Sequence, residues 1–214
     1  MKNKQMMTAC LLTGAALLFT LLIKVVDVQA VGPNGSAVGF AAINDAVRKG
    51  LGTSLGWYKI SKILGYVAIL TGGLFACLGL WQLVQRKSLK KVDKVFFVLA
   101  ALYVLLVIFW KGFDKIALNY RPILENGVLE PSYPSTHSLL GLVFFGSAVP
   151  MIVNYVKPGM VQKLLVGLAC LGALLTVLAR FLSGVHWLTD IVGGILIAAA
   201  MLAWFWYFVK KYHP

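Results

Sequence analysis

A short polar segment from Ala179 to Asp190, ARFLSGVHWLTD, places ionisable residues between two long apolar runs. His186 and Asp190 are four residues apart, so on a helix they would share one face. A carboxylate beside an imidazole fixes the tautomer of the ring and stabilises its positive form, which serves nucleophilic and acid–base catalysis. Arg180, at the end of the preceding apolar run, could clamp an anion. The pattern predicts a reactive histidine beside an anion-binding group.

A second polar segment, residues 111–138, carries the remaining candidates. Arg121 offers another guanidinium, and Ser135 and His137 follow Pro134. Guanidinium groups match the oxygens of a phosphate, and amides at a helix end can add further donors. Two arginines, two histidines, a hydroxyl and a carboxylate therefore suit a phosphate oxyanion.

A metal centre is the alternative chemistry for such a site. A two-metal phosphatase needs several carboxylate or histidine ligands. The only carboxylates in the two polar segments are Asp114, Glu125, Glu130 and Asp190. We therefore predict a phosphate-binding site that uses no metal or other cofactor.

Long apolar runs must position these residues. The chain has 214 residues, of which 60% are hydrophobic, and several runs approach or exceed the roughly 18–20 residues that span a bilayer as a helix. None of the runs alternates as a membrane β-strand does. We predict a single all-α integral membrane domain over residues 1–214. Its six transmembrane helices are expected at residues 7–26, 57–84, 95–110 (continuing toward 120), 138–155, 161–178 and 188–209.

The segment between the first and second spans is rich in glycine, and residues 38–47 within it could form an amphipathic helix at the membrane interface. The first span could instead be a signal peptide, because Val28-Gln29-Ala30 resembles a small-x-small cleavage site. Cleavage there would leave the later topology unchanged.

The chain has 20 lysine and arginine residues against 7 aspartate and glutamate residues. In a membrane protein this excess indicates anchoring by the positive-inside rule, so we predict contacts with membrane lipids and none with nucleic acid. Basic residues gather at the amino terminus, at 86–94, at 157–163 and at the carboxyl tail. We expect a multi-pass protein of the cell membrane with both termini cytoplasmic and both polar segments extracytoplasmic. His213 would then lie on the face opposite the site, outside the chemistry.

Three short patterns, taken in order, resemble the motifs of a known family. These are Arg121-Pro122, then Pro134-Ser135-Thr136-His137, then Arg180 with His186 and Asp190. They resemble the type 2 phosphatidic acid phosphatase family, the lipid phosphate phosphatases, whose active-site pattern is shared with vanadium haloperoxidases. The motif-bearing stretch covers residues 111–190, and the six-span layout extends the resemblance across the chain.

The resemblance implies a role for each residue. His186 would attack phosphorus to form a phosphohistidine, and Asp190 would orient it. His137 would protonate the leaving oxygen and later activate water. The equatorial oxygens would be held by Arg121, Arg180, Ser135 and the amides near Thr136, which fits a reaction driven by positioning and charge stabilisation.

The chain departs from the family pattern at three positions. The family lysine falls at position 114, where this chain has Asp114. Lys115 points about 100° away on a regular helix but would reach the phosphate if the helix frayed near Tyr120, and Lys111 is the other candidate. Thr136 stands in place of a glycine, and Ala179 in place of a serine.

The expected activity is hydrolysis of a lipid phosphate or diphosphate at the outer leaflet. Undecaprenyl diphosphate, phosphatidylglycerophosphate and phosphatidate are the candidate substrates, with a slight preference for the first on family grounds. The alternative is a non-catalytic lipid-binding or transport protein that uses the same cationic site. The spans show no internal repeat of the kind found in transporters, and phosphate release would separate the two hypotheses.

Overall fold

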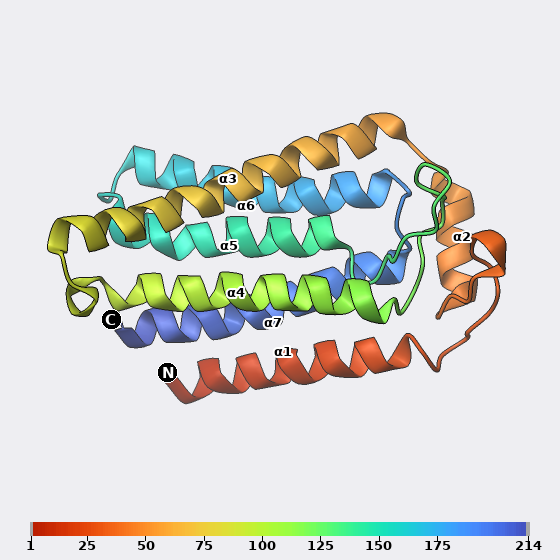
Figure 1. Cartoon of the computed structure of the whole chain (residues 1–214), viewed down its shortest axis with the longest axis horizontal. Coiled ribbons are helices and arrows are strands. Elements are labelled where there is room, and N and C mark those ends of the chain that lie inside the picture. Colours follow the sequence, from red (N-terminus) through yellow and green to blue (C-terminus); the bar gives the residue numbers. More distant parts are fainter. Residues whose placement is uncertain (1, 213–214) are drawn as a thin grey trace.

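The computed structural model describes residues 2–212, and the described chain is helical (Figure 1). Six helices are long and apolar enough to cross a membrane. They are α1 (Lys2–Leu22), α3 (Leu55–Arg86), α4 (Lys94–Ile116), α5 (Thr136–Tyr155), α6 (Met160–Leu182) and α7 (Leu188–Tyr212). The shorter α2 (Ala41–Leu51) and two 3₁₀ turns, Pro33–Gly35 and Leu89–Lys91, lie between them. These elements confirm the predicted all-α membrane fold with six spans.

Helix α5 is the most buried of the six spans, and it packs against α3, α4, α6 and α7. Glycines on its neighbours make room for its aromatic side chains. A β-carbon at Gly72 of α3 would lie 2.3 Å from the ring of Phe144, and one at Gly172 of α6 would lie 2.8 Å from that of Phe145. Small residues at such crossings let membrane helices approach closely. The outer faces of the other spans carry exposed leucine, isoleucine and valine, which suits contact with lipid.

The connecting segments are divided between the two ends of the bundle (Figure 1). One end holds the start of α1, the end of α7 and the α3–α4 and α5–α6 connections, which carry the basic residues of the two terminal segments, of residues 86–94 and of residues 157–163. The other end holds residues 23–54, 117–135 and 183–187. The two termini and the basic loops 86–94 and 157–163 thus lie at one end of the bundle, as the charge pattern predicts. That this end faces the cytoplasm stays a prediction.

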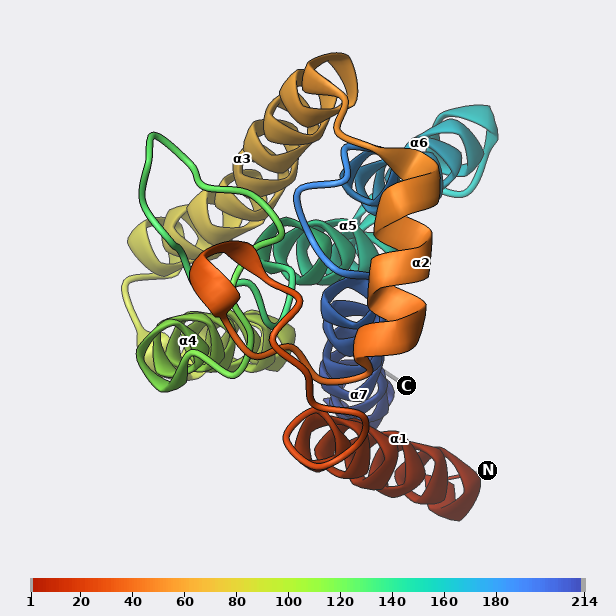
Figure 2. The same ribbon diagram turned by 90° about the vertical axis from the view of Figure 1, so that its right-hand side faces the viewer.

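The amphipathic helix predicted within residues 38–47 is α2, which runs from Ala41 to Leu51. Figure 2 shows it lying across the polar end of the bundle in front of α7. Asn44 of α2 is buried and makes this contact. Its side-chain nitrogen donates to the Thr189 hydroxyl at 2.9 Å, and its side-chain oxygen accepts from the Thr189 backbone amide at 3.1 Å. Asn44 thus joins α2 to the first turn of α7.

Helix α3 is longer than the bilayer requires. Its 32 residues rise about 48 Å, against a hydrocarbon core of about 30 Å. A helix of this length tilts or extends beyond the core, and Figure 1 shows α3 inclined across α5 and α6. Its first two turns lie at the polar end of the molecule, beside the segment 117–135.

The predicted bounds of the spans differ from the structure mainly in the first helix. Residues 7–26 were expected, whereas α1 runs from Lys2 to Leu22. The sequence prediction followed the apolar residues, but Val25 and Val26 belong to a turn that leads to Asp27, which has a positive φ of 44°. The carboxylate of Asp27 accepts from the Ala42 amide at 2.7 Å, so this turn ends against the start of α2. His213 lies outside the described residues.

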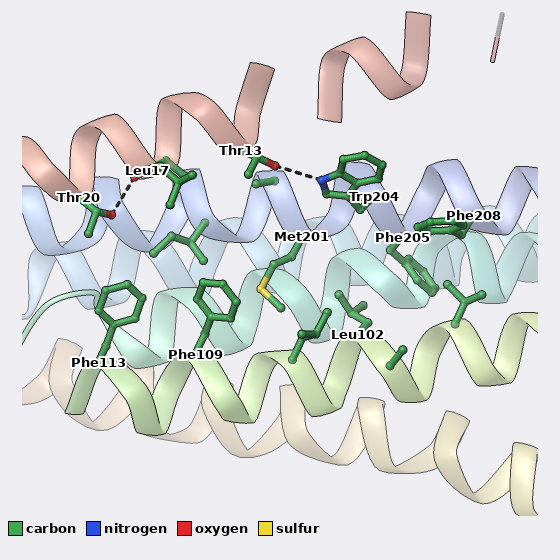
Figure 3. Close-up of a pocket in the computed structure, with 16 residues that line it drawn as sticks. Thr13, Leu17, Thr20, Leu102, Phe109, Phe113, Met201, Trp204, Phe205 and Phe208 are labelled. Atoms are coloured by element: carbon green, nitrogen blue, oxygen red, sulfur yellow. Dashed lines mark hydrogen bonds between the residues drawn. The ribbon is translucent and has the colours of Figure 1, made fainter. Parts of the chain in front are cut away.

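Among the apolar cavities between the spans, two can be compared with the predicted site. One, of about 380 Å³, is bounded by α1, α4 and α7, and Trp204 donates to the Thr13 hydroxyl at 3.1 Å beside it (Figure 3). The other, of about 1040 Å³, lies between α3, α5 and α6. None of the predicted site residues lines either cavity.

Candidate active site

His186 lies in the turn between α6 and α7, two residues before α7 begins. The expectation that a helix would bring it to the same face as Asp190 is therefore wrong, although the two side chains do meet. His186 Nδ1 lies 3.4 Å from Asp190 Oδ2. That oxygen also accepts from the Trp187 amide at 2.9 Å, so Asp190 caps α7 from inside its first turn. The cap and the histidine contact share one carboxylate.

Arg180, in the last turn of α6, faces the other nitrogen of the same ring. Its Nη2 lies 3.2 Å from His186 Nε2, and its Nη1 donates to the Ser61 hydroxyl at 3.1 Å. The guanidinium carbon lies 5.2 Å from the centre of the Tyr58 ring. The residue is 1% exposed, and its buried Nε has no hydrogen-bond partner. The guanidinium is held firmly and keeps one free donor.

These surroundings determine the protonation of His186. Burial lowers the pKa of this imidazole well below its usual 6.5, and the charges of Arg180, Arg121 and His137 lower it further. The ring is therefore neutral at neutral pH. With its Nδ1 proton directed to Asp190, the Nε2 lone pair points toward Arg180 and accepts from it. A neutral imidazole with an oriented lone pair is equipped to act as a nucleophile.

Ser135 precedes α5, and this helix start is docked onto the start of α7. The Ser135 amide donates to the Asp190 carbonyl at 2.9 Å, and the Ser135 hydroxyl lies 3.0 Å from that of Ser138. Gly194 of α7 permits this approach, because a β-carbon there would lie 3.2 Å from the Ser135 carbonyl oxygen. Thr136 is the first residue of α5. Amides at the start of a helix lack intrahelical partners, so they are available to an anion.

His137 lies one residue further into α5, against the neighbouring α3. A β-carbon on Gly65 would come within 3.0 Å of His137 Cδ2. Gly65 lies one turn after Ser61, whose hydroxyl accepts from Arg180, and Arg180 in turn contacts His186. The structure thus places His137, in the first turn of α5, and His186, in the turn between α6 and α7, at the same end of the bundle.

Arg121 belongs to a small hairpin within the segment 117–135. Its amide donates to the Glu130 carbonyl at 2.9 Å, and its guanidinium pairs with Glu130 at 3.1 Å and also with Glu125. Its Nε is buried without a hydrogen-bond partner. Glu125 connects Arg121 to the site, because its carboxylate also accepts from Tyr58, whose ring lies against Arg180.

Lys115 is the predicted residue that the structure leaves apart. It is exposed in the last turn of α4, and among residues 2–212 it has no hydrogen bond or ion pair with the other candidates. Lys111 lies 4.0 Å from Asp114 and 4.1 Å from the centre of the Trp110 ring. Helix α4 ends at Ile116, and the next residue, Ala117, has a left-handed backbone conformation. Lys115 is within the regular helix, so the fraying that would turn its side chain toward the site is not seen.

Helix α3 supplies a wall of the site that sequence reasoning missed. Its site-facing residues follow the spacing of one helical face: Tyr58, Ser61, Lys62 and Gly65. They contact Arg180, Glu125 and His137. The sequence shows a serine and a lysine in the opening turns of an apolar span, and that polar stripe was the available signal.

Two asparagines that carry no sequence motif support the carboxylate of Asp190. The Asn119 side-chain nitrogen donates to Asp190 Oδ1 at 3.4 Å, and the Asn119 side-chain oxygen accepts from the Gly39 backbone amide at 3.3 Å. Asn44 holds Thr189, the residue next to Asp190. Helix α2 and the segment after α4 therefore fix the start of α7. Across residues 2–212, no group of three or more histidine, cysteine, aspartate or glutamate side chains is arranged to hold a metal ion.

The geometry described so far is that of a multi-pass helical membrane protein with a cationic, histidine-containing site at one end. Comparison with known proteins identifies its family. The sequence profile of the PAP2 superfamily matches residues 109–214, which include both histidines and both arginines of the site. The chain belongs to the type 2 phosphatidic acid phosphatase family and is a membrane lipid phosphatase.

A solved structure supports the fold over almost the whole chain. The transmembrane PAP2 type phosphatidylglycerolphosphate phosphatase from Bacillus subtilis superposes with a TM-score of 0.63 at 17% identity. The match covers 95% of this chain and 96% of that one. No curated protein matches the sequence.

Proposed function

We propose that this protein hydrolyses a lipid phosphate or diphosphate at the outer leaflet through a phosphohistidine on His186. In the first step His186 Nε2 forms a bond to phosphorus, and the bond from phosphorus to the leaving oxygen breaks. His137 gives its proton to that oxygen. In the second step His137 takes a proton from water, the hydroxide attacks phosphorus, and the P–N bond breaks to release phosphate and the free imidazole.

One observation carries this proposal: both nitrogens of His186 have defined partners. Nδ1 faces the Asp190 carboxylate and Nε2 faces the Arg180 guanidinium. The carboxylate would stabilise the positive ring that forms when Nε2 bonds to phosphorus. The guanidinium would exchange its contact with Nε2 for one with a phosphate oxygen, which frees the Nε2 lone pair beside phosphorus. Positioning and charge stabilisation of this kind are what phosphoryl transfer requires.

Phosphate binding is supported by unused donors. Arg121 and Arg180 each have a buried Nε without a hydrogen-bond partner, and a buried unpaired donor is costly. A phosphate placed between the two guanidiniums would satisfy both. We assign the remaining oxygen contacts to the Ser135 hydroxyl and to the amides near Thr136. These assignments require no metal ion.

A lipid is the substrate class that best fits this environment. The site lies at the end of a bundle of membrane spans, where a phosphate headgroup reaches the interface while its apolar chains stay among the helices. The Bacillus subtilis neighbour is a phosphatidylglycerolphosphate phosphatase by its description, which supports that lipid as a candidate. Undecaprenyl diphosphate and phosphatidate complete the set to be tested.

The direct experiment compares these three substrates with purified protein in detergent, with released phosphate as the readout. We expect the wild type to hydrolyse at least one and His186→Ala to hydrolyse none. Lys115→Ala is a control that retains every residue of the assembled site. Protein quenched during turnover with a ³²P-labelled substrate should carry alkali-stable, acid-labile phosphate that His186→Ala lacks.

Residual turnover in His186→Ala would refute the covalent mechanism. Loss of activity with a chelator, together with indifference to vanadate, would instead indicate a metal-dependent enzyme. Binding of all three lipids without any phosphate release would favour the lipid-binding alternative.

A further inference from the structure

Glu125 is a carboxylate surrounded by the donors of the proposed phosphate site. Tyr58 donates its hydroxyl to Oε1, the Arg121 guanidinium pairs with Oε2, and Lys62 Nζ lies 3.8 Å from Oε1. Burial raises the pKa of Glu125, but the hydrogen bond from Tyr58 and the charges of Arg121 and Lys62 outweigh it, so the net shift is downward. The group is an anion at neutral pH.

We propose that Lys62 of α3 binds a non-bridging oxygen of the substrate phosphate, and that Glu125 holds this place in the free protein. The inference rests on the proposed phosphatase function. It assigns to α3 the third cation of the site, which the family pattern expects at position 114. Phosphate and carboxylate are recognised by the same donors, so the contacts of Glu125 mark where a second anion can bind.

The position of Lys62 within α3 supports this role. Ser61, the preceding residue, accepts from Arg180 Nη1 at 3.1 Å, and Tyr58, one turn earlier, stacks against the same guanidinium. Lys62 Nζ lies 4.4 Å from the centre of the Tyr58 ring. Its side chain is 44% exposed, whereas that of Arg121 is 15% exposed. The ammonium therefore lies at the open side of the site, within reach of an arriving headgroup.

The two lysines near the end of α4, Lys111 and Lys115, are poorer candidates. Lys115 is exposed at the end of α4, and Lys111 is engaged with Asp114 at 4.0 Å. Neither shares a partner with Arg121, whereas Lys62 and Arg121 contact the two oxygens of one carboxylate. Shared coordination of a single anion places Lys62 in the site.

Glu125 lies where its release requires little rearrangement. The Glu125 and Val128 backbones exchange hydrogen bonds at 3.0 Å around Asn126 and Gly127, both of which have positive φ. The carboxylate thus stands at the tip of a two-residue hairpin turn of the kind that asparagine and glycine favour. A phosphate carries more charge than a carboxylate and would displace it from Lys62 and Arg121.

The experiment compares Lys62→Met with Lys115→Met in detergent, with turnover of the best lipid substrate and inhibition by vanadate as readouts. We expect Lys62→Met to lower kcat/KM by at least about tenfold, the effect of losing one charge-assisted hydrogen bond, and to weaken vanadate inhibition comparably. Lys115→Met should stay within about twofold of wild type on both measures, since an exposed lysine contributes little. Lys62→Arg, which keeps the charge, should recover most of the loss.

Equal activity and equal vanadate inhibition in Lys62→Met and wild type would overturn the inference, and loss in Lys115→Met instead would assign the role to α4. Thermal unfolding separates this failure from failure of the proposed function. If the wild type hydrolyses none of the lipids, the rise in unfolding temperature with vanadate still tests the site. A rise in wild type that disappears in Lys62→Met supports Lys62, and an equal rise in both refutes it. If Lys62→Met does not fold, Lys62→Gln and Lys62→Arg provide the same contrast.

Discussion

The imidazole of His137 lies against the backbone of Gly65, with room for a hydrogen but not for a methyl group. A β-carbon at position 65 would stand 3.0 Å from Cδ2 and 3.6 Å from Nε2 of this ring. Because Gly65 has no side chain, the His137 ring can approach the backbone of α3 this closely. Such a contact can be tested by a single added carbon.

We expect Gly65→Ala to reduce turnover by about tenfold or more, since small displacements of a catalytic group are costly. The added methyl must push the His137 ring by a few tenths of an ångström. Gly73→Ala is the matched control, because a β-carbon at that position of the same helix meets nothing within 4 Å. Both changes replace a helical glycine and should raise intrinsic helix stability by about 1 kcal/mol. Equal kcat values for the two variants would argue against a precisely placed His137.

The second prediction concerns Asp190, whose side chain is fully buried. Asp190→Asn keeps an oxygen that can accept from the Trp187 amide, so the cap of α7 should survive. It removes the charge that would stabilise the positive His186 ring, and we expect turnover to fall by about 10²–10⁴-fold. The measurement is kcat together with thermal unfolding, with the exposed Asp114→Asn as control. Poor expression with normal specific activity would show that Asp190 serves the fold alone.

The third prediction uses the pH dependence of kcat/KM. Burial, Arg180 and Arg121 hold the pKa of His186 below 6.5, and the neutral ring is the reactive form. Activity that depends on His186 is therefore retained at pH 6.5 and is lost only at lower pH. Arg121→Gln removes one positive charge, so the pKa should move up toward 6.5 and the acid limb should move with it.

The ratio of Arg121→Gln to wild-type activity should accordingly decline as the pH falls from about 7.5 to about 5, across the range of histidine titration. Ionisation of the substrate affects both enzymes and cancels in this ratio. A constant ratio would mean that Arg121 binds substrate without influencing His186.

The fourth prediction concerns the orientation of the protein in the membrane. The native cysteines, Cys10, Cys77 and Cys170, can be replaced by alanine because all three are exposed and free. In that background Asn126→Cys should react with a membrane-impermeant maleimide in intact cells. Leu89→Cys, at the basic end, should react only after permeabilisation. The reverse pattern would place the site on the cytoplasmic side.

The sequence was sufficient to predict the spans and to select the polar residues between the last turn of α6 and the first turn of α7 as candidates. Apolar length identifies a membrane helix because the bilayer has a fixed thickness. The four-residue spacing pointed to the contact between His186 and Asp190, although His186 lies in a turn and not on the helix that the spacing assumed. Helix bounds were less certain where apolar residues continue past the helix end, as Val25 and Val26 do after α1. Roles assigned to individual residues stay predictions.

The contribution of α3 could not be predicted in the same way. Contacts such as Ser61 with Arg180 join residues 119 positions apart, and they depend on how α3 crosses α5 and α6. Local spacing carries no information about that crossing. Asn44 and Asn119 escaped notice for the same reason, because an isolated asparagine has no motif until its partners are known.

The length of α3 has a consequence for the reaction cycle. Tyr58 and Lys62 lie within the first two turns of a helix that rises about 18 Å more than the hydrocarbon core. Because the site lies at this end of α3, we expect these residues at the depth of lipid headgroups, above the chains that fill the core. A lipid can deliver its phosphate there by lateral diffusion, without desorbing from the leaflet. Inorganic phosphate would leave into water while the dephosphorylated lipid stays behind, so the two products separate by solubility alone.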